Sequence, residues 1–160
     1  MRLEYTLKFR DYVLFNAVHQ FLSVKMQAFC LLVAWLIYWM ESKGDQAVAI
    51  TIAVMGYLFL WVFQFVFTAF YLFSAKNKSL LTTHVVEVQD QAFYEETPFN
   101  RSFHYWPGIA RVVRRPGFAA VYLSAVAAHI IPRRAFASDQ QVDQFVALVE
   151  ERMRAAQRTD

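Results

Sequence analysis

Residues 46–75 form an uninterrupted run without a charged side chain, and this run constrains the chain more than any other feature. A helix that crosses the roughly 30 Å hydrocarbon core of a bilayer needs about 20 apolar residues, because each residue adds about 1.5 Å. The run exceeds that length. The whole chain has 160 residues, of which 58% are hydrophobic and 18% charged. This composition excludes a disordered protein and favours a membrane segment joined to a small domain.

A second uncharged stretch, residues 26–40, precedes the first along the chain and is shorter. It approaches spanning length by drawing on the residues before it, with the Lys25 side chain extending toward the headgroups. A buried or re-entrant segment is the alternative. A short polar loop joins the two stretches. We predict a transmembrane helical hairpin over 24–74, with spans at about 24–40 and 47–73.

Lysine and arginine are distributed unevenly around this hairpin. Four precede the first stretch and eleven follow the second, whereas the connecting loop contains only Lys43. Loops rich in these residues stay on the cytoplasmic side of a membrane. We therefore expect a multi-pass protein with both termini in the cytoplasm.

Each predicted span carries a stripe of small and polar residues at helical spacing. Small residues let membrane helices approach closely, and polar ones can hydrogen-bond across the contact. The simpler interpretation is that the two spans pack against each other, and a homo-oligomer interface is the alternative. The residues expected at this contact are Cys30, Ala34, Ala49, Ala53, Gly56 and Gln64.

Beyond the second span, the pattern changes to short alternating runs separated by turn signals such as Pro107–Gly108 and Pro116–Gly117. Such runs are typical of a small antiparallel sheet or barrel. We read 81–89, 92–97, 100–106, 109–115, 118–124 and 125–132 as the strands.

The last segment is predicted to be a helix, because Ser138 can cap it and Gln141 follows at the spacing of a capping box. Residues 1–23 are predicted to contain a strand, which could join the sheet, and an amphipathic helix. With a domain at 80–157, the expected class is an α+β membrane protein.

The motif residues Trp106, Ile109, Pro132, Ala135 and Phe136, with the flanking sequence IIPRRAF, resemble the YcxB-like family. The resemblance covers most of the chain and is strongest over 103–150. It implies a bacterial protein of the inner membrane, with a two-helix anchor and a pleckstrin-homology-like cytoplasmic domain, in which a C-terminal helix closes a curved sheet. The pairs Pro107–Gly108 and Gln91–Ala92 depart from the family pattern. The family has no assigned activity.

The motif residues have structural interpretations. Trp106 is expected to be buried with its N–H satisfied. Pro132 ends the last strand because proline has no N–H to donate to a sheet. Ala135 and Phe136 are expected to pack their apolar side chains into the core.

Candidate catalytic residues are sparse. The histidines His19, His84, His104 and His129 lie on different predicted elements, so a metal site would require tertiary convergence with a carboxylate. Glu95 and Glu96 are adjacent on a strand and point to opposite faces. We therefore expect no catalytic residue, no cofactor, no metal and no enzymatic activity.

The basic residues Arg114, Arg115, Arg133 and Arg134 are candidates for contact with anionic lipid headgroups or with a partner. Membrane topology and ordinary solubility explain these residues more simply. The excess of positive charge is small, +3 for the chain, so nucleic-acid binding is not expected.

Three functions remain open for a chain held in the lipid bilayer. The first is a cytoplasmic interaction module, such as a scaffold or adaptor, that binds a protein partner or a second copy of itself. The second is a domain that binds anionic headgroups. The third is an uncharacterised membrane enzyme.

Overall fold

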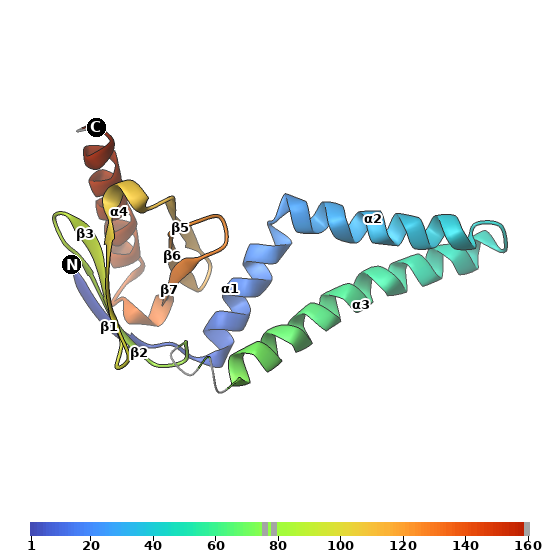
Figure 1. Cartoon of the computed structure of the whole chain (residues 1–160), viewed down its shortest axis with the longest axis horizontal. Coiled ribbons are helices and arrows are strands. Elements are labelled where there is room, and N and C mark those ends of the chain that lie inside the picture. The colour runs from blue at the N-terminus through green and yellow to red at the C-terminus, as the bar shows by residue number, and fades with distance from the viewer. Residues whose placement is uncertain (75–76, 78–79, 159–160) are drawn as a thin grey trace. The chain divides into compact units, whose positions relative to one another are not determined.

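The computed structural model describes residues 1–74, 77 and 80–158. The chain divides into two compact units, and the first joins the two ends of the chain, Met1–Tyr12 and Ala75–Asp160. The second unit is Val13–Ser74. Figure 1 labels the helices and strands along the chain. The class is α+β, with two small antiparallel sheets and a C-terminal helix in the first unit and apolar helices in the second.

The first unit contains a four-stranded sheet and a three-stranded sheet. The four-stranded sheet has the order β1 (Arg2–Thr6), β2 (Thr83–Val88), β3 (Ala92–Glu96) and β4 (Arg101–Tyr105). The three-stranded sheet has the order β5 (Arg111–Arg115), β6 (Phe118–Tyr122) and β7 (Ala128–Pro132). All neighbouring strands are antiparallel.

The N-terminal strand belongs to the first sheet although most of its partners lie far along the chain. Leu3 is opposite Val86, and Tyr5 is opposite His84. Both Leu3 and Tyr5 are buried, while the residues between them are exposed. This is the pairing that the alternating N-terminal pattern predicts.

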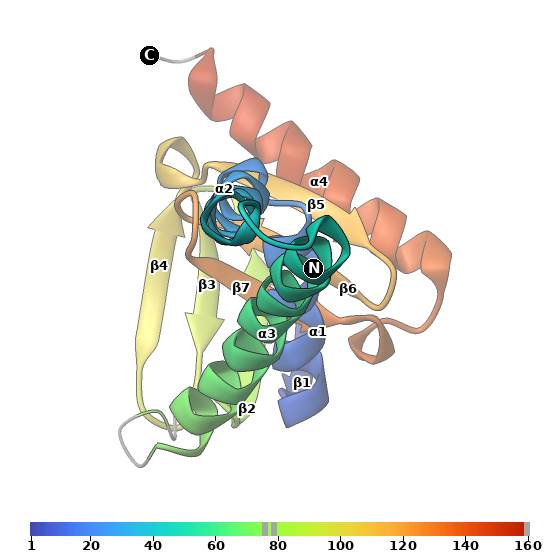
Figure 2. The same cartoon turned by 90° about the vertical axis from the view of Figure 1, so that its right-hand side faces the viewer.

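The core of the first unit lies under α4 (Asp139–Gln157), which runs along β5 (Figure 2). All five residues of β6 are buried because it is the central strand of its sheet. The buried stripe of α4 is Val142, Phe145 and Val149. Ser138 caps the helix by accepting a hydrogen bond from the Gln141 N–H.

Each predicted strand overlaps an observed strand but differs from it at one or both ends, and two of these differences have a local cause. The run 125–132 was expected to begin directly after the preceding strand, but β7 begins at Ala128 because the Ser124 hydroxyl accepts hydrogen bonds from the amides of Val126 and Ala127. Trp106 was expected at the end of a strand. It instead begins a short 3-10 helix, Trp106–Gly108, because Pro107 cannot donate to a sheet.

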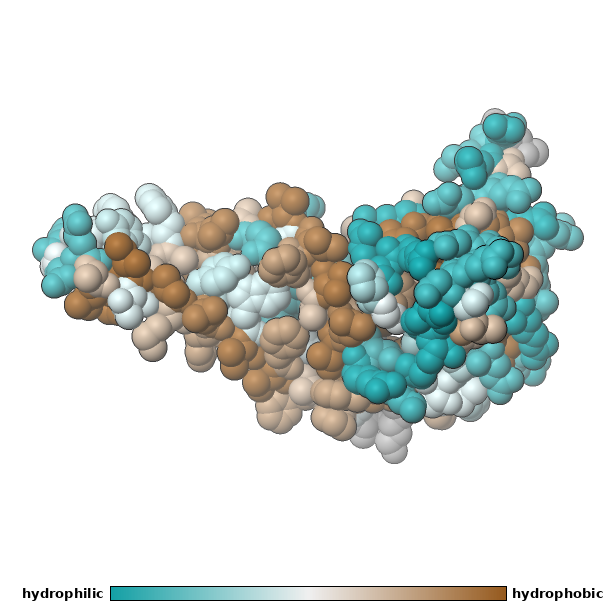
Figure 3. Space-filling model, turned by 180° about the vertical axis from the view of Figure 1, so that it is seen from behind, coloured by the Kyte–Doolittle hydropathy of each residue, from teal (hydrophilic) through white to brown (hydrophobic). Residues whose placement is uncertain are grey.

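The second unit contains two long helices, α2 (Val24–Glu41) and α3 (Gln46–Phe73), which lie side by side as a hairpin (Figure 1). Both are long and apolar enough to cross a membrane. Within the 18-residue apolar stretch of each helix, only 6% of the residues are buried. Hydrophobic residues accordingly cover much of the hairpin surface in Figure 3.

Of the residues before Lys25, only Val24 belongs to α2, so the first predicted span is not extended as expected. A separate helix, α1 (Phe9–Phe21), ends before Ser23, and Ser23 caps α2 by accepting from the Met26 N–H at 3.4 Å. The Gln27 side chain also donates to the Phe21 carbonyl, so the break between the helices is held by hydrogen bonds.

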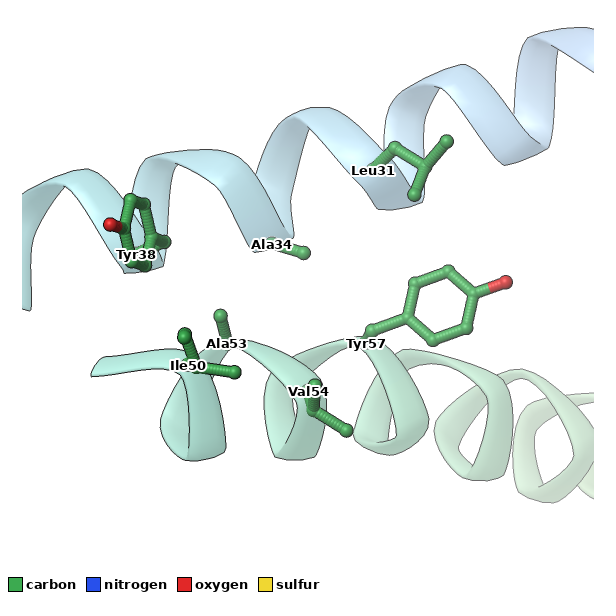
Figure 4. Close-up of a pocket in the computed structure, with 7 residues that line it drawn as sticks. All are labelled: Leu31, Ala34, Tyr38, Ile50, Ala53, Val54 and Tyr57. Atoms are coloured by element: carbon green, nitrogen blue, oxygen red, sulfur yellow. The ribbon is translucent and has the colours of Figure 1, made fainter. Parts of the chain in front are cut away.

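Small side chains lie where the two long helices meet. Ala49, Ala53 and Cys30 are buried, and Gln64 is half-buried. The Tyr57 hydroxyl donates to the Gln27 side chain across the helix pair at 3.0 Å. Figure 4 shows Ala34 and Ala53 beside an apolar cavity of about 330 Å³ between the helices.

Gly56 lies close to Ile37 of α2, because a Cβ at this position would lie 2.6 Å from the Ile37 Cδ1 atom. We expect Gly56→Leu to lower the free energy of unfolding by about 1–3 kcal/mol through overpacking. The measurement is SDS-induced unfolding of the purified protein in micelles, monitored through tryptophan fluorescence. The matched control is Ala47→Leu, at an exposed position of the same helix. An equal loss in both variants would contradict the close approach.

Candidate functional site

A cluster of three histidines and one glutamate lies on the inner side of the four-stranded sheet. Glu95 of β3 is opposite Val86, two residues from His84 on β2, and His104 of β4 is opposite Phe93. Because side chains alternate along a strand, His84, Glu95 and His104 point to one face of this sheet. His129 reaches the cluster from β7 of the other sheet.

The side chains of the cluster form a continuous chain of hydrogen bonds. Glu95 Oε1 lies 2.9 Å from His84 Nδ1 and 3.2 Å from His129 Nδ1. The Nε2 atoms of His129 and His104 are 2.9 Å apart. All three contacts are satisfied when both Nδ1–H groups donate to Glu95 and the His104 Nε2–H donates to His129 Nε2.

The surroundings fix the charges in this cluster. Burial raises the pKa of Glu95, but hydrogen bonds from His129 and His84 outweigh it and hold that pKa far below its usual range. Burial and the neighbouring His129 lower the pKa of His104. Burial, and then the charge of Glu95, raise the pKa of Tyr5, which stacks on His84. Glu95 is therefore a buried carboxylate and His104 a neutral imidazole at neutral pH.

A cavity of about 230 Å³ opens beside the cluster. Its wall includes His84, Glu95 and His129, together with Tyr5, Tyr12 and Asn100. The arrangement can relay a proton or bind a small cation. The prediction that these histidines lie on different elements is correct. The tertiary convergence that a shared site requires was not expected, but it does occur.

Most of the motif residues lie in the core of the first unit. Trp106 is 3% exposed, and its Nε1–H donates to the Asp90 carbonyl at 3.0 Å. Ile109 and Phe136 are buried, and Ala135 is half-buried. Pro132 is the last residue of β7.

The arginines predicted to contact headgroups or a partner are mostly engaged within the domain. Arg114 pairs with Asp139 and Asp143, and Arg133 pairs with Asp139 at 2.6 Å. Through the shared Asp139, these pairs link β5 and the segment after β7 to the start of α4.

The other two arginines have different partners. Arg134 contacts both oxygens of Asp11 and donates to the Thr6 carbonyl. Arg115 donates to the Arg114 carbonyl. Three of the four guanidinium groups are therefore paired with carboxylates of the same unit, as intramolecular ion pairs.

The sequence did not single out the aromatic residues of β4, which is an edge strand of its sheet. Phe103 is 56% exposed and Tyr105 is 64% exposed, and Phe99 in the preceding turn is 65% exposed. We call these three residues the β4 aromatic row. The turn signals did indicate a strand at 100–106, but not that it would lie at an edge.

Comparisons with known proteins bear on the first unit. Comparison with curated proteins and with solved structures gave no match. The model of a family described as YcxB-like protein matches residues 88–149. This match contains Trp106, Ile109 and the IIPRRAF segment, on which the resemblance was based. The predicted resemblance is confirmed over residues 88–149, where the chain carries the sequence pattern of the YcxB-like family.

Proposed function

We propose that this chain is a membrane-anchored interaction module of the bacterial inner membrane. In this proposal α2 and α3 form a transmembrane hairpin, and both termini are cytoplasmic. The first unit is a pleckstrin-homology-like domain that binds an extended segment of another protein along β4. The lengths of the two apolar helices, the excess of lysine and arginine outside their connecting loop, and the order of seven strands before a C-terminal helix support this proposal.

The observation that carries the proposal is the open edge of β4. The Thr97 N–H donates to the Asn100 carbonyl at 2.9 Å, at the end of the β3–β4 hairpin. Hydrogen-bonded and non-hydrogen-bonded pairs alternate in an antiparallel ladder. The backbone N–H and C=O groups of Arg101, Phe103 and Tyr105 are therefore directed away from β3. Such an edge is a template for an added strand.

The side chains of β4 indicate the chemistry of the added strand. Phe103 and Tyr105 lie on the outer face of the sheet, and the Phe103 ring rests on Tyr94 at a centroid distance of 4.9 Å. Arg101 on the same face is already paired with Glu96. The edge therefore suits an uncharged segment with apolar side chains at every second position, which would extend the aromatic surface.

Site-specific photo-crosslinking of the full chain in native membranes tests the proposal. A photoreactive residue at Phe103 is expected to give a discrete adduct with a second protein. The matched control is the same residue at Val126, which is apolar and 76% exposed in the β6–β7 connection. A photoreactive residue at Tyr105 is expected to give the same adduct, and the added substitution Phe103→Pro is expected to abolish it. Proline removes an outward N–H without breaking the hydrogen bonds to β3.

Three outcomes would overturn this proposal. Probes at Phe103 and Val126 that give the same adducts would show non-specific contact. Absence of any adduct would leave the β4 edge without a partner. An adduct with a second copy of the chain would replace the partner protein by self-association.

The headgroup-binding alternative receives less support from the arginines. Arg114, Arg133 and Arg134 are each neutralised by an aspartate, so an anionic lipid would have to displace an existing ion pair. Arg115 differs, because its side chain donates to a backbone carbonyl.

A further inference from the structure

We propose that Glu95, His104 and His129 bind a divalent transition-metal ion, and that zinc matches the site best. This site lies on the inner face of the sheet, and it is independent of partner binding at the β4 edge. One ligand atom from each of the three residues lies within 4.8 Å of the other two. The three residues come from β3, β4 and β7.

The distances are compatible with a tetrahedral site after small side-chain movements. Zinc bonds of about 2.0–2.2 Å to nitrogen and oxygen place neighbouring ligand atoms about 3.3 Å apart. The two histidine Nε2 atoms are 2.9 Å apart. Glu95 Oε1 lies 3.2 Å from His129 Nδ1, so the carboxylate must turn toward the Nε2 side of the ring to share the ion. All three ligand atoms lie within 4.8 Å of one another, so no separation must contract by more than about 1.5 Å.

The donor set selects the class of ion. Two imidazoles and a carboxylate suit zinc and its neighbours among the transition metals, whereas magnesium and calcium prefer oxygen ligands alone. Glu95 supplies a buried negative charge, with only 7% of the residue exposed. His84 holds the same carboxylate through Nδ1, in the position of an outer group that orients a ligand.

Binding requires one change of tautomer and no other chemistry. Two imidazole Nε2 atoms now face each other, so one of them must carry the shared proton. When the His104 proton moves to Nδ1, both Nε2 lone pairs become available to the ion. The ion then takes the place of the shared proton between the rings. The adjacent cavity leaves room for a water molecule as a fourth ligand.

The consequence is a link between the two sheets. Glu95 and His104 belong to the four-stranded sheet and His129 to the three-stranded sheet, so one ion would tie them together. An ion that binds the folded state and not the unfolded chain stabilises the fold in proportion to its affinity.

The test uses the full chain in detergent micelles, first treated with a chelator and then titrated with zinc. We expect one ion per chain and a rise in Tm. Cobalt is expected to give the visible absorption of a tetrahedral site. Glu95→Gln and His104→Gln are each expected to weaken zinc binding at least about tenfold.

Two matched controls separate this site from adventitious binding. Glu96→Gln removes the neighbouring carboxylate on the opposite face, and His19→Gln removes a histidine of α1. Neither should change zinc affinity. Equal losses in the test and control variants, or no zinc-dependent change in the wild-type chain, would overturn the proposal. If His104→Gln fails to fold, the wild-type cobalt spectrum still decides, because a spectrum without tetrahedral bands contradicts the site.

Discussion

Replacing Phe145 with alanine should lower the free energy of unfolding of the β-rich unit by about 3–5 kcal/mol. Phe145 is fully buried on α4, and its ring meets the edge of Phe136 at a centroid distance of 5.5 Å. Truncation removes this contact and leaves a cavity between α4 and the sheet. The loss is large because the neighbouring Val142 and Val149 are also buried and can fill the space only partly.

The measurement is a denaturant titration in micelles, monitored through hydrogen exchange of the β5–β7 amides. Phe103→Ala is the matched control, since it removes the same atoms from a half-exposed position on β4. We expect this control to change stability far less than Phe145→Ala. Similar losses for the two variants would contradict the core described under α4.

Replacing Arg134 with methionine should lower the free energy of unfolding of the same unit by about 2–3 kcal/mol. The Arg134 guanidinium joins both oxygens of Asp11 and the Thr6 carbonyl, and Asp11 is buried. Methionine preserves much of the side-chain volume but leaves the carboxylate without its counter-charge. Arg115→Met is the control, because Arg115 donates only to the backbone carbonyl of Arg114 among the hydrogen bonds of the described residues.

The same variant should change the dependence of stability on pH. Burial raises the pKa of Asp11, but hydrogen bonds from Arg134 and the Lys8 amide outweigh it and hold that pKa below its ordinary value of 3.8. A carboxyl with a lowered pKa stabilises the fold above its unfolded pKa, and this contribution is lost as pH falls through the folded pKa. The stability gap between wild type and Arg134→Met should therefore narrow below about pH 4. A gap that stays constant into more acidic solution would contradict this role for Asp11.

The elements specified by local pattern were predictable from the sequence. The apolar run predicted a span at about 47–73, and α3 covers Gln46–Phe73 because Asp45 caps its first turn. Ser138 was likewise predicted from its local sequence to cap the last helix. Each of these features depends on residues within one or two helical turns. The Ser124 turn was missed because its hydroxyl competes with the strand pattern around it.

The histidine–glutamate cluster depends on longer-range geometry. Part of the cluster was predictable from the sequence. A turn at 90–91 fixes the β2–β3 register, which places Glu95 opposite Val86 and on the same face as His84. The opposite orientation of Glu95 and Glu96 was also predicted, and only Glu95 is buried. His129 belongs to a different sheet, and nothing local to either strand indicates how the two sheets face each other. The partner of Arg134 was hidden for the same reason, since Asp11 is 123 residues away.

The pairing of β1 with β2 constrains the membrane topology proposed above. Thr6 and Thr83 meet in the ladder although 77 positions separate them, and both α2 and α3 lie between them in the chain. Two strands that share hydrogen bonds must occupy the same aqueous compartment, so the intervening chain must cross a bilayer an even number of times. A chain that stopped after one crossing would strand Leu3 and Tyr5 on the opposite side from β2. For the proposed hairpin, the first sheet therefore limits the topology to an even number of crossings, independently of where lysine and arginine lie.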